Sequence, residues 1–215
     1  SKAYAAIEAA KFLKASDPRL LIGCNPWNTD PRHLQSYLDS FDLLEPEVRR
    51  LMEGRMDRSI ADRYRASGRE ISSYIVYVKQ NTVHQYRRGY WANLDYGFDG
   101  YCAIYGLIAQ SGDPFNSYDF AKKNSKCRSD WNAAYCNADT GMITPSRRLE
   151  SWYQGLVDMK LVKWCRRRIA ERKAKGEDVS AFEKEIAETI TAANQPRSDL
   201  SAARARILAL SDRML

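Results

Sequence analysis

The chain has 215 residues and a formal net charge of +7 at pH 7, with 44% hydrophobic and 11% aromatic residues. This apolar content excludes an intrinsically disordered chain and is enough for one large or two small domains. No run of about 18 apolar residues predicts a membrane span, and the first residues lack the pattern of a signal peptide. We therefore expect a cytoplasmic protein, or one inside a virion, whose basic surplus favours a polyanionic partner.

The cysteines and histidines indicate neither a metal site nor a disulfide framework. Five cysteines, an odd number without a secretion signal, are typical of reduced thiols, and no two have zinc-knuckle spacing. The chain has only two histidines, and they lie far apart. No phosphate-binding glycine loop or known catalytic motif occurs, so we assign no catalytic residue, metal or cofactor and do not expect an enzyme.

Helical patterns dominate the sequence from start to end. The spacing of apolar residues and the capping residues predict helices at 2–15, after Pro31, and at 46–53, 60–66, 68–80, 101–110, 145–175, 180–194 and 199–214. Residues 81–101 are expected to be irregular or to form a short helix, and residues 115–142 carry no clear pattern. The β-branched run 74–78 also fits a strand, but apolar residues at helical spacing between 71 and 78 favour a helix.

Residues 44–80 resemble the helix-turn-helix of bacterial and phage regulators, recombinases and small terminases. Ile60 and Ala61 match the anchors of the second helix in that family, and Ala66 matches the small residue after the turn. Ser67 matches the cap of the third, recognition helix, whose buried side would hold Ile71 and Ile75. The turn residue is commonly Gly in the family but is Arg65 here, and glycine follows only at Gly68.

The resemblance implies that the start of the third helix contacts bases in the major groove. Arg69 would read guanine, and Glu70 would accept a hydrogen bond from cytosine or favour the helix N-terminus. The nucleic-acid-binding residues expected from this segment are Ser67, Gly68, Arg69, Glu70, Ser72, Ser73 and Lys79.

A dense basic run lies at residues 160–175, with eight Lys or Arg against one Glu. We expect Arg166, Arg167 and Arg168 to bind phosphates without sequence preference, although a solvated helix face explains the run equally well. The preceding segment, 144–164, weakly resembles the helix before the wing of winged-helix domains, and an ordinary core helix is its alternative.

The last 40 residues contain two amphipathic helices that would cover each other or a second chain. Apolar residues at 179, 182, 186 and 190 form one stripe, and those at 200, 207 and 210 face it. Because isolated helices of this length are marginal in water, we expect a helical hairpin or an oligomerisation element.

The sequence thus predicts a mainly α protein with four parts: an N-terminal helical segment (1–42), a helix-turn-helix (43–81), a helical domain that is winged-helix-like in one reading (82–175), and a C-terminal element (176–215). The leading expectation is a homo-oligomeric regulator that binds specific sites in double-stranded DNA, with RNA or single strands as other partners and no membrane. The alternatives are a virion or DNA-packaging protein and an enzyme with a polar site around 93–140.

Overall fold

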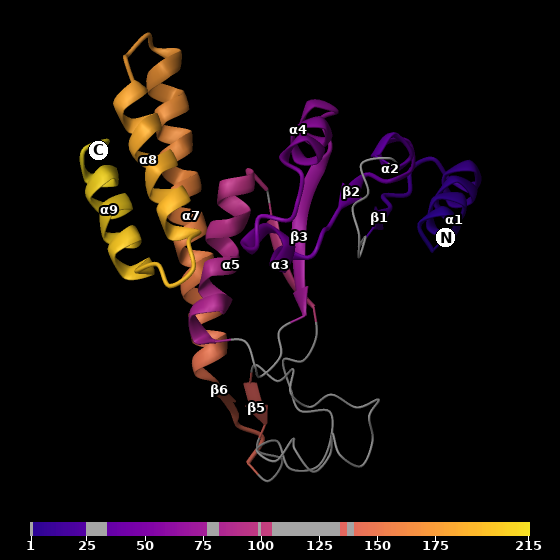
Figure 1. The fold of residues 1–215 in the computed structure, drawn as a ribbon, viewed down its shortest axis with the longest axis horizontal. Coiled ribbons are helices and arrows are strands. Elements are labelled where there is room, and N and C mark those ends of the chain that lie inside the picture. Colours follow the sequence, from indigo (N-terminus) through magenta and orange to yellow (C-terminus); the bar gives the residue numbers. More distant parts are fainter. Residues whose placement is uncertain (1, 25–33, 77–81, 99, 105–133, 137–139) are drawn as a thin grey trace. The chain divides into compact units, whose positions relative to one another are not determined.

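The computed structural model describes residues 2–24, 34–76, 82–98, 100–104, 134–136 and 140–215, which are mostly helical, as the sequence predicts (Figure 1). The chain divides into two compact units. Unit 1 comprises residues 1–75 and 92–102, and unit 2 comprises residues 76–91 and 103–215. Within the described part, no helix combines the length and apolar character needed to cross a bilayer.

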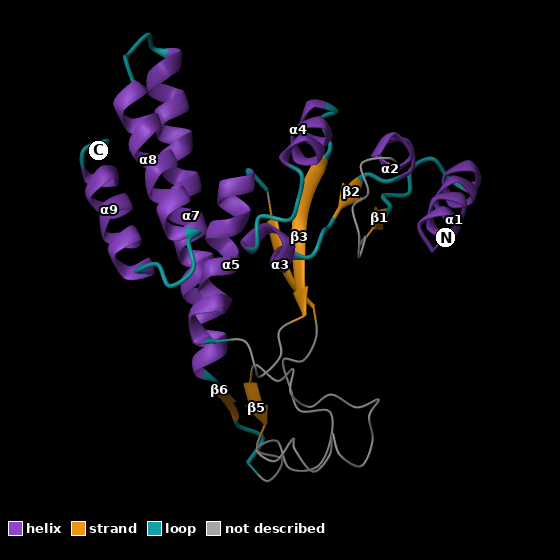
Figure 2. Cartoon of the chain, viewed as in Figure 1, coloured by secondary structure: helices purple, strands orange, loops and turns teal. Residues whose placement is uncertain are grey.

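Unit 1 is built around a sheet that the sequence did not predict. Its strands are β1 (Gly23–Cys24), β2 (Leu43–Leu44), β3 (Glu70–Val76) and β4 (Gly100–Ile104), in that order across the sheet. The first three are labelled in Figure 2. The pairs β1–β2 and β2–β3 are parallel. Parallel neighbours need crossover connections, and helices supply them: α2 (Leu34–Ser40) follows β1, and α3 (Val48–Met52) and α4 (Arg58–Ala66) follow β2. Helix α5 (Val83–Tyr96) follows β3. Helix α1 (Lys2–Ser16) precedes β1.

The two faces of this sheet differ in burial. Side chains alternate between the faces of a strand, and Leu44, Ile71 and Ser73 are fully buried on one of them. Helices α2, α3 and α4 contribute further buried side chains to this core, among them Tyr37, Val48, Ile60 and Tyr64. On the other face Leu43, Glu45 and Ser72 are only half-buried. The apolar face therefore holds the core of unit 1, and the other face is partly open at Leu43, Glu45 and Ser72.

The predicted recognition helix at 68–80 is wrong, because residues 70–76 form strand β3. Helix α4 ends at Ala66, and Gly68 has a φ of +73°. Its amide donates to the carbonyl of Arg65, and the amide of Arg69 donates to that of Tyr64. This is a Schellman C-cap with glycine at the left-handed position. The Ala-Ser-Gly segment therefore ends one helix and leads into a strand instead of starting a second helix.

Two neighbouring expectations are also corrected. The helix predicted at 101–110 is not formed at its start, where residues 100–104 make strand β4. The region expected to be irregular or a short helix contains the 14-residue helix α5. At residues 100–104 pairing with a strand distant in the sequence decides the structure, and local apolar spacing does not report such pairing.

Unit 2 is a helical layer with one small hairpin. It contains the first part of α5, then α7 (Arg147–Ala174), α8 (Ser180–Ala193) and α9 (Leu200–Asp212). Strands β5 (Ala134–Cys136) and β6 (Ile143–Pro145) pair antiparallel before α7. The winged-helix reading is wrong, since α7 continues to Ala174 and the next element is helix α8 where a wing strand was expected.

The C-terminal apolar stripe is buried within the chain. Val179, Ile186 and Ile190 are nearly inaccessible, and so are Leu200, Ile207 and Leu210 on α9. Phe182 is half-buried, with the guanidinium groups of Arg172 and Arg213 over its ring. Helices α8 and α9 thus form a hairpin that also packs on α7.

A buried carboxylate joins three helices of unit 2. The side chain of Asp158 in α7 is fully inaccessible to solvent. It accepts hydrogen bonds from Arg87 Nε at 2.6 Å and from the indole nitrogen of Trp91 at 3.0 Å, both on α5. Arg204 on α9 donates to its second oxygen. Asp158 therefore has well-placed donors on both oxygens, as a buried charge requires.

Candidate functional site

The most distinctive polar cluster lies at the end of β2, the second strand of the sheet in unit 1. Ligands of parallel α/β sheets bind beyond the carboxyl ends of the strands. Among the described residues, the segment that leaves such an end is Glu45-Pro46-Glu47, directly after Leu44. Two glutamates at this edge are what a ligand-binding or catalytic site in such a sheet would use.

The backbone holds this segment in place as an extension of the sheet. The amide of Glu45 donates to the carbonyl of Cys24 at 2.9 Å, and the amide of Tyr74 donates to the carbonyl of Pro46 at 3.1 Å. A parallel bridge also pairs Glu47 with Tyr74. Both glutamates are therefore anchored to neighbouring strands on rigid backbone, which is how precise sites are built.

Register brings the polar side chains onto one face. Leu44 pairs with Ile71, so Glu45 stands level with Ser72, and the Ser72 hydroxyl donates to Glu45 Oε1 at 3.2 Å. Because side chains alternate along a strand, Glu47 and Tyr74 follow on the same face two residues later. On β4, a Cβ at Gly100 would lie 3.1 Å from that of Ser72. The glycine thus keeps the space beside Ser72 and Glu45 open.

Glu47 is largely buried and has one loose ionic partner. It is only 8% exposed. Its Oε1 lies 3.5 Å from Nε of Arg49, a residue whose side chain is 45% exposed. This is an ion pair but too long for a good hydrogen bond, and it is the only ion pair of Glu47 within the described residues. A largely buried carboxylate with one loose partner is costly for stability, and proteins break such local rules chiefly at functional sites.

Cys24 borders the cluster but is a poor nucleophile. Burial raises the pKa of its thiol, and the negative charge of Glu45 raises it further. A reactive cysteine needs the opposite environment, one that stabilises the thiolate. We therefore assign the chemistry of this edge to the glutamates.

Arg69, the predicted base-reading residue, lies at the opposite edge of the sheet, where β3 begins. Burial raises the pKa of Asp42, but hydrogen bonds from the Lys14 ammonium and the Ile22 amide, with the charges of Lys14 and Arg69, lower it overall. The charge of Arg69 also acts on Tyr64, whose pKa is raised mainly by burial. Polar groups at this amino-terminal edge contribute to stability. In β/α folds the amino ends of the strands generally have this role, and the carboxyl ends hold the active site.

The other residues expected at a recognition helix are dispersed. The Ser67 hydroxyl donates to the Tyr64 carbonyl at the end of α4, and Glu70 begins β3. Ser73 is fully buried in the core face, whereas Ser72 is on the glutamate face. Lys79 lies outside the described residues. The structure therefore brings only Ser72 of this set into the candidate site.

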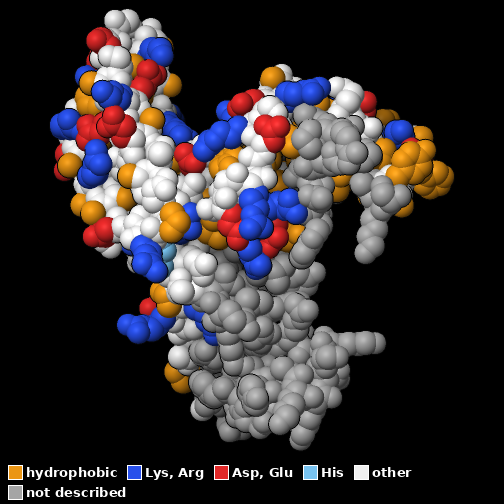
Figure 3. Space-filling view, in the orientation of Figure 1, with side chains coloured by type: hydrophobic (Ala, Val, Ile, Leu, Met, Phe, Trp, Pro, Cys, Tyr) orange, Lys and Arg blue, Asp and Glu red, His pale blue; other side chains and the backbone are white. Residues whose placement is uncertain are grey.

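The basic run on α7 is partly neutralised. Arg168 pairs with Glu171 at 2.6 Å and lies 6.0 Å from the ring centre of Trp164. Arg172 and Lys173 pair with Glu177 and Glu183. Arg166 and Arg167 are exposed. The run is thus a surface in which cations and carboxylates alternate, and this mixture is visible over the helices of unit 2 in Figure 3.

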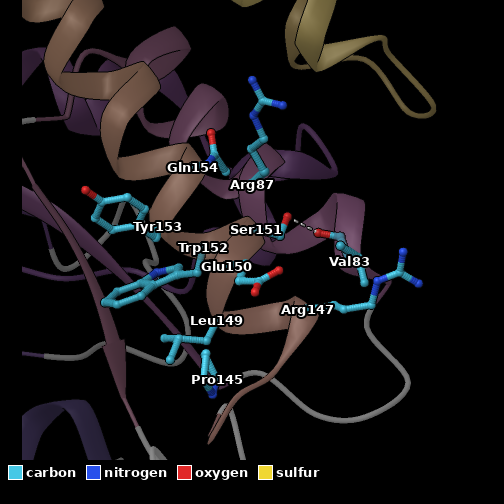
Figure 4. Close-up of a pocket in the computed structure, with 10 residues that line it drawn as sticks. All are labelled: Val83, Arg87, Pro145, Arg147, Leu149, Glu150, Ser151, Trp152, Tyr153 and Gln154. Atoms are coloured by element: carbon cyan, nitrogen blue, oxygen red, sulfur yellow. Dashed lines mark hydrogen bonds between the residues drawn. The ribbon is translucent and has the colours of Figure 1, made fainter.

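A groove of about 650 Å³ lies beside the first turns of α7 in unit 2. Its size suits a small ligand, but Figure 4 shows the rings of Trp152 and Tyr153 on one side of the helix and Arg147 and Ser151 on the other. Arg87 in its wall is bonded to Asp158, and the Ser151 hydroxyl donates to the Val83 carbonyl at 2.6 Å. Its reactive groups do not converge on one point, so we favour the sheet edge as the site.

Little in the sequence points to Glu45 and Glu47 as site residues. Their signal is a pair of acidic residues directly after the short apolar run Leu43-Leu44, and we interpreted the Pro46 between them as a helix start. No protein-family model matches the sequence, and no curated protein matches it either. Among the described residues, no group of three or more His, Cys, Asp or Glu side chains is placed to hold a metal ion.

Proposed function

We propose that the chain carries the site of an acid–base enzyme, with Glu45 and Glu47 as its two carboxylates. The observation that carries this proposal is their place: directly after a parallel strand, on the half-open face of the sheet, with Glu47 buried beside a single loose cation. Rigid strands that present polar groups at their carboxyl ends are the usual scaffold for catalysis in β/α folds. This proposal differs from the sequence-based expectation of a non-enzymatic protein, which stays a prediction.

Hydrolysis of a glycosidic bond is the reaction that two such carboxylates serve most directly. One carboxylic acid donates a proton to the leaving oxygen, while the other carboxylate acts as a nucleophile or takes a proton from water. Ser72, which donates to Glu45, would orient that carboxylate during either step. Proton transfer of this kind contributes about 10²- to 10⁴-fold to rate.

Chromogenic substrates test the proposal. We expect the protein to release nitrophenolate from a panel of 4-nitrophenyl α- and β-glycosides, and Glu45→Gln and Glu47→Gln each to reduce the rate by about 100-fold or more. Glu53→Gln is the matched control, because Glu53 is exposed at the end of α3 and pairs with Arg55. Release from esters or phosphates alone, or equal rates in all three variants, would contradict the assignment.

A second proposal, binding of nucleic acid through α7, retains part of the sequence-based expectation. Lys160, Lys163 and Arg167 are exposed and spaced at three and four residues, so they share one face of the helix. Such a row binds phosphates without reading bases. Replacing all three with Gln should flatten the salt dependence of binding to a random DNA duplex. A wild-type protein that binds no duplex at low salt would refute it.

A further inference from the structure

The outward face of α7 carries cations without neighbouring carboxylates. Between residues 151 and 170 the one acidic residue of the helix is Asp158, which is fully buried and bonded to arginines of α5 and α9. Lys160 and Arg167 are exposed and form no ion pair with another described residue. A helix face with cations and no accessible carboxylate is complementary to a polyanion.

An exposed aromatic side chain lies on the same face. Tyr153 is 59% exposed, and Val157 beside it is 36% exposed. The outward side of α7 holds five residues at steps of three and four, which we call the α7 row: Tyr153, Val157, Lys160, Trp164 and Arg167. The buried residues of the helix lie on its opposite side. Aromatic rings that alternate with cations along a surface are what proteins use to stack unpaired bases and hold their phosphates.

The groove of about 650 Å³ in unit 2 adjoins the start of the α7 row, because Tyr153 belongs to both. Val83, Leu149 and Tyr153 give the groove apolar walls, and Arg147 adds an exposed cation. Its volume is sufficient for a nucleobase. Stacking of a flat ring does not require polar groups that converge on one point. The groove and the row therefore place a site for a base next to sites for phosphates.

The arrangement favours unpaired bases over paired ones. With a rise of about 1.5 Å per residue, Lys160 lies about 10 Å and Arg167 about 21 Å from Tyr153 along the helix axis. A strand of a few nucleotides spans this length. In a duplex each base is stacked and paired between the two backbones, so it cannot reach a tyrosine on the helix that contacts the phosphates. Bases of a single strand are free to do so.

We propose that the α7 row and the adjoining groove bind single-stranded nucleic acid, with a base stacked on Tyr153 and phosphates held by Lys160 and Arg167. This inference rests on the second proposed function, binding of nucleic acid through α7, and names the form of nucleic acid that the surface binds. It does not depend on the glutamate site in unit 1.

Binding of three labelled DNA probes, followed by fluorescence anisotropy, tests the proposal. The probes are an oligothymidine of about 20 nucleotides, an abasic strand with the same number of phosphates, and a duplex of the same length. The wild-type protein should bind the oligothymidine about tenfold more tightly than either other probe, because only this probe offers unpaired bases. Tyr153→Ala should remove the preference over the abasic strand without changing the melting temperature.

The cations and a distant aromatic residue provide the matched variants. Lys160→Gln combined with Arg167→Gln should weaken binding of both single strands to the same extent and should reduce its salt dependence. Phe12→Ala is the control, since Phe12 is 72% exposed but lies in unit 1, and this variant should bind all three probes as the wild type does.

Equal affinities of the wild-type protein for the oligothymidine and the abasic strand would overturn the inference. A base preference that survives Tyr153→Ala would overturn it as well, and either result would leave phosphate binding by α7 in place. A protein that binds neither single strands nor the duplex at low salt would overturn this inference together with the second proposed function. None of these results depends on hydrolysis of a glycoside.

Discussion

Asp158 in α7 and Glu47 after β2 are both carboxylates that the fold removes from water, but their surroundings differ. Asp158 accepts hydrogen bonds from Arg87, Trp91 and Arg204, which arrive from two other helices. Glu47 has one exposed arginine at 3.5 Å. The first carboxylate is saturated with donors, and the second retains unused capacity to accept a hydrogen bond.

The difference in hydrogen-bond donors distinguishes a charge that stabilises the fold from one that is available for function. A saturated buried carboxylate cannot bind anything else, and its removal leaves two arginines without a counter-charge. A buried carboxylate with unmet hydrogen-bonding capacity lowers stability, and proteins retain such groups where function needs them. Removing the charge of Asp158 should therefore lower the free energy of unfolding, whereas removing that of Glu47 should leave it unchanged or raise it. Substitutions elsewhere in the chain should have effects of intermediate size.

The largest effect is expected from Asp158→Ala. Breaking a buried ion pair by removing one partner costs about 3–5 kcal/mol, because the remaining charge is left unpaired. Urea unfolding followed by tryptophan fluorescence should show this loss. Glu150→Ala on the same helix removes an exposed carboxylate and should change stability by less than about 0.5 kcal/mol. If the two substitutions changed stability equally, Asp158 would not be a structural charge, and the comparison with Glu47 would fail.

The next largest effect is expected from Gly155→Ala, at the close approach of α7 to α5. A Cβ at this position would lie 2.2 Å from Cδ2 of Tyr90 and 3.0 Å from the backbone oxygen of Arg87. Tyr90 is fully buried, so it has little room to move. Overpacking should cost about 1–3 kcal/mol. If alanine instead raised the melting temperature, as its helix propensity alone predicts, the two helices would not be in this contact.

A smaller effect is expected from Gly68→Ala, at the end of α4. The added Cβ meets nothing within 4 Å, so only the strain of a φ of +73° remains. This strain should cost about 1–2 kcal/mol, and Gly68→Asn should cost less, because Asn tolerates this conformation. Both are measured by thermal melting. A recognition helix starting at this residue would give the reverse result, since alanine would then stabilise it.

The dependence of stability on acidic pH provides a smaller test, at Asp42. Burial raises its pKa, but the hydrogen bonds from Lys14 and Ile22 and the nearby cations lower it overall. A lowered pKa in the folded state means that the carboxylate stabilises unit 1 above its unfolded pKa of about 3.9, and that this contribution is lost as pH falls. Asp42→Asn should therefore reduce stability at pH 7 by less than about 1 kcal/mol. The variant should also lose less stability than the wild type on acidification, as urea midpoints at pH 7 and at pH 3 would show.

The sequence predicts the helices of unit 2 well, because their signals are local. Ser146 caps α7 through the Leu149 amide, and Asp199 caps α9 through the amides of Ser201 and Ala202. The apolar periodicity that predicts α8 continues through its buried residues. The sequence does not indicate that Asp158 is a buried ion-pair partner. Its donors on α5 precede it by 67 or more residues, and its donor on α9 follows it by 46.

Unit 1 was misread because its decisive interactions are long-range. Apolar residues between 71 and 78 fit a helical period and a strand equally well, and only parallel pairing with β2 settles the choice. Gly68 is the usable local signal: the helix-turn-helix pattern expects glycine at the position of Arg65, and the glycine that comes later, Gly68, is the C-cap that ends α4. Strands of two residues, such as β2, carry no periodicity at all, so Glu45 and Glu47 could not be located at a strand end.

The smallest effect on stability is expected at Glu47, and it tests the central claim most directly because it requires no substrate. We compare the free energy of unfolding in urea of Glu47→Gln with that of the wild-type protein at pH 7. If Glu47 is a functional carboxylate held beside a single loose cation, the neutral amide should leave stability unchanged or raise it by about 1 kcal/mol. A loss of about 2 kcal/mol or more would show that Glu47, like Asp158, is a structural charge, and would contradict a functional site at the carboxyl end of β2.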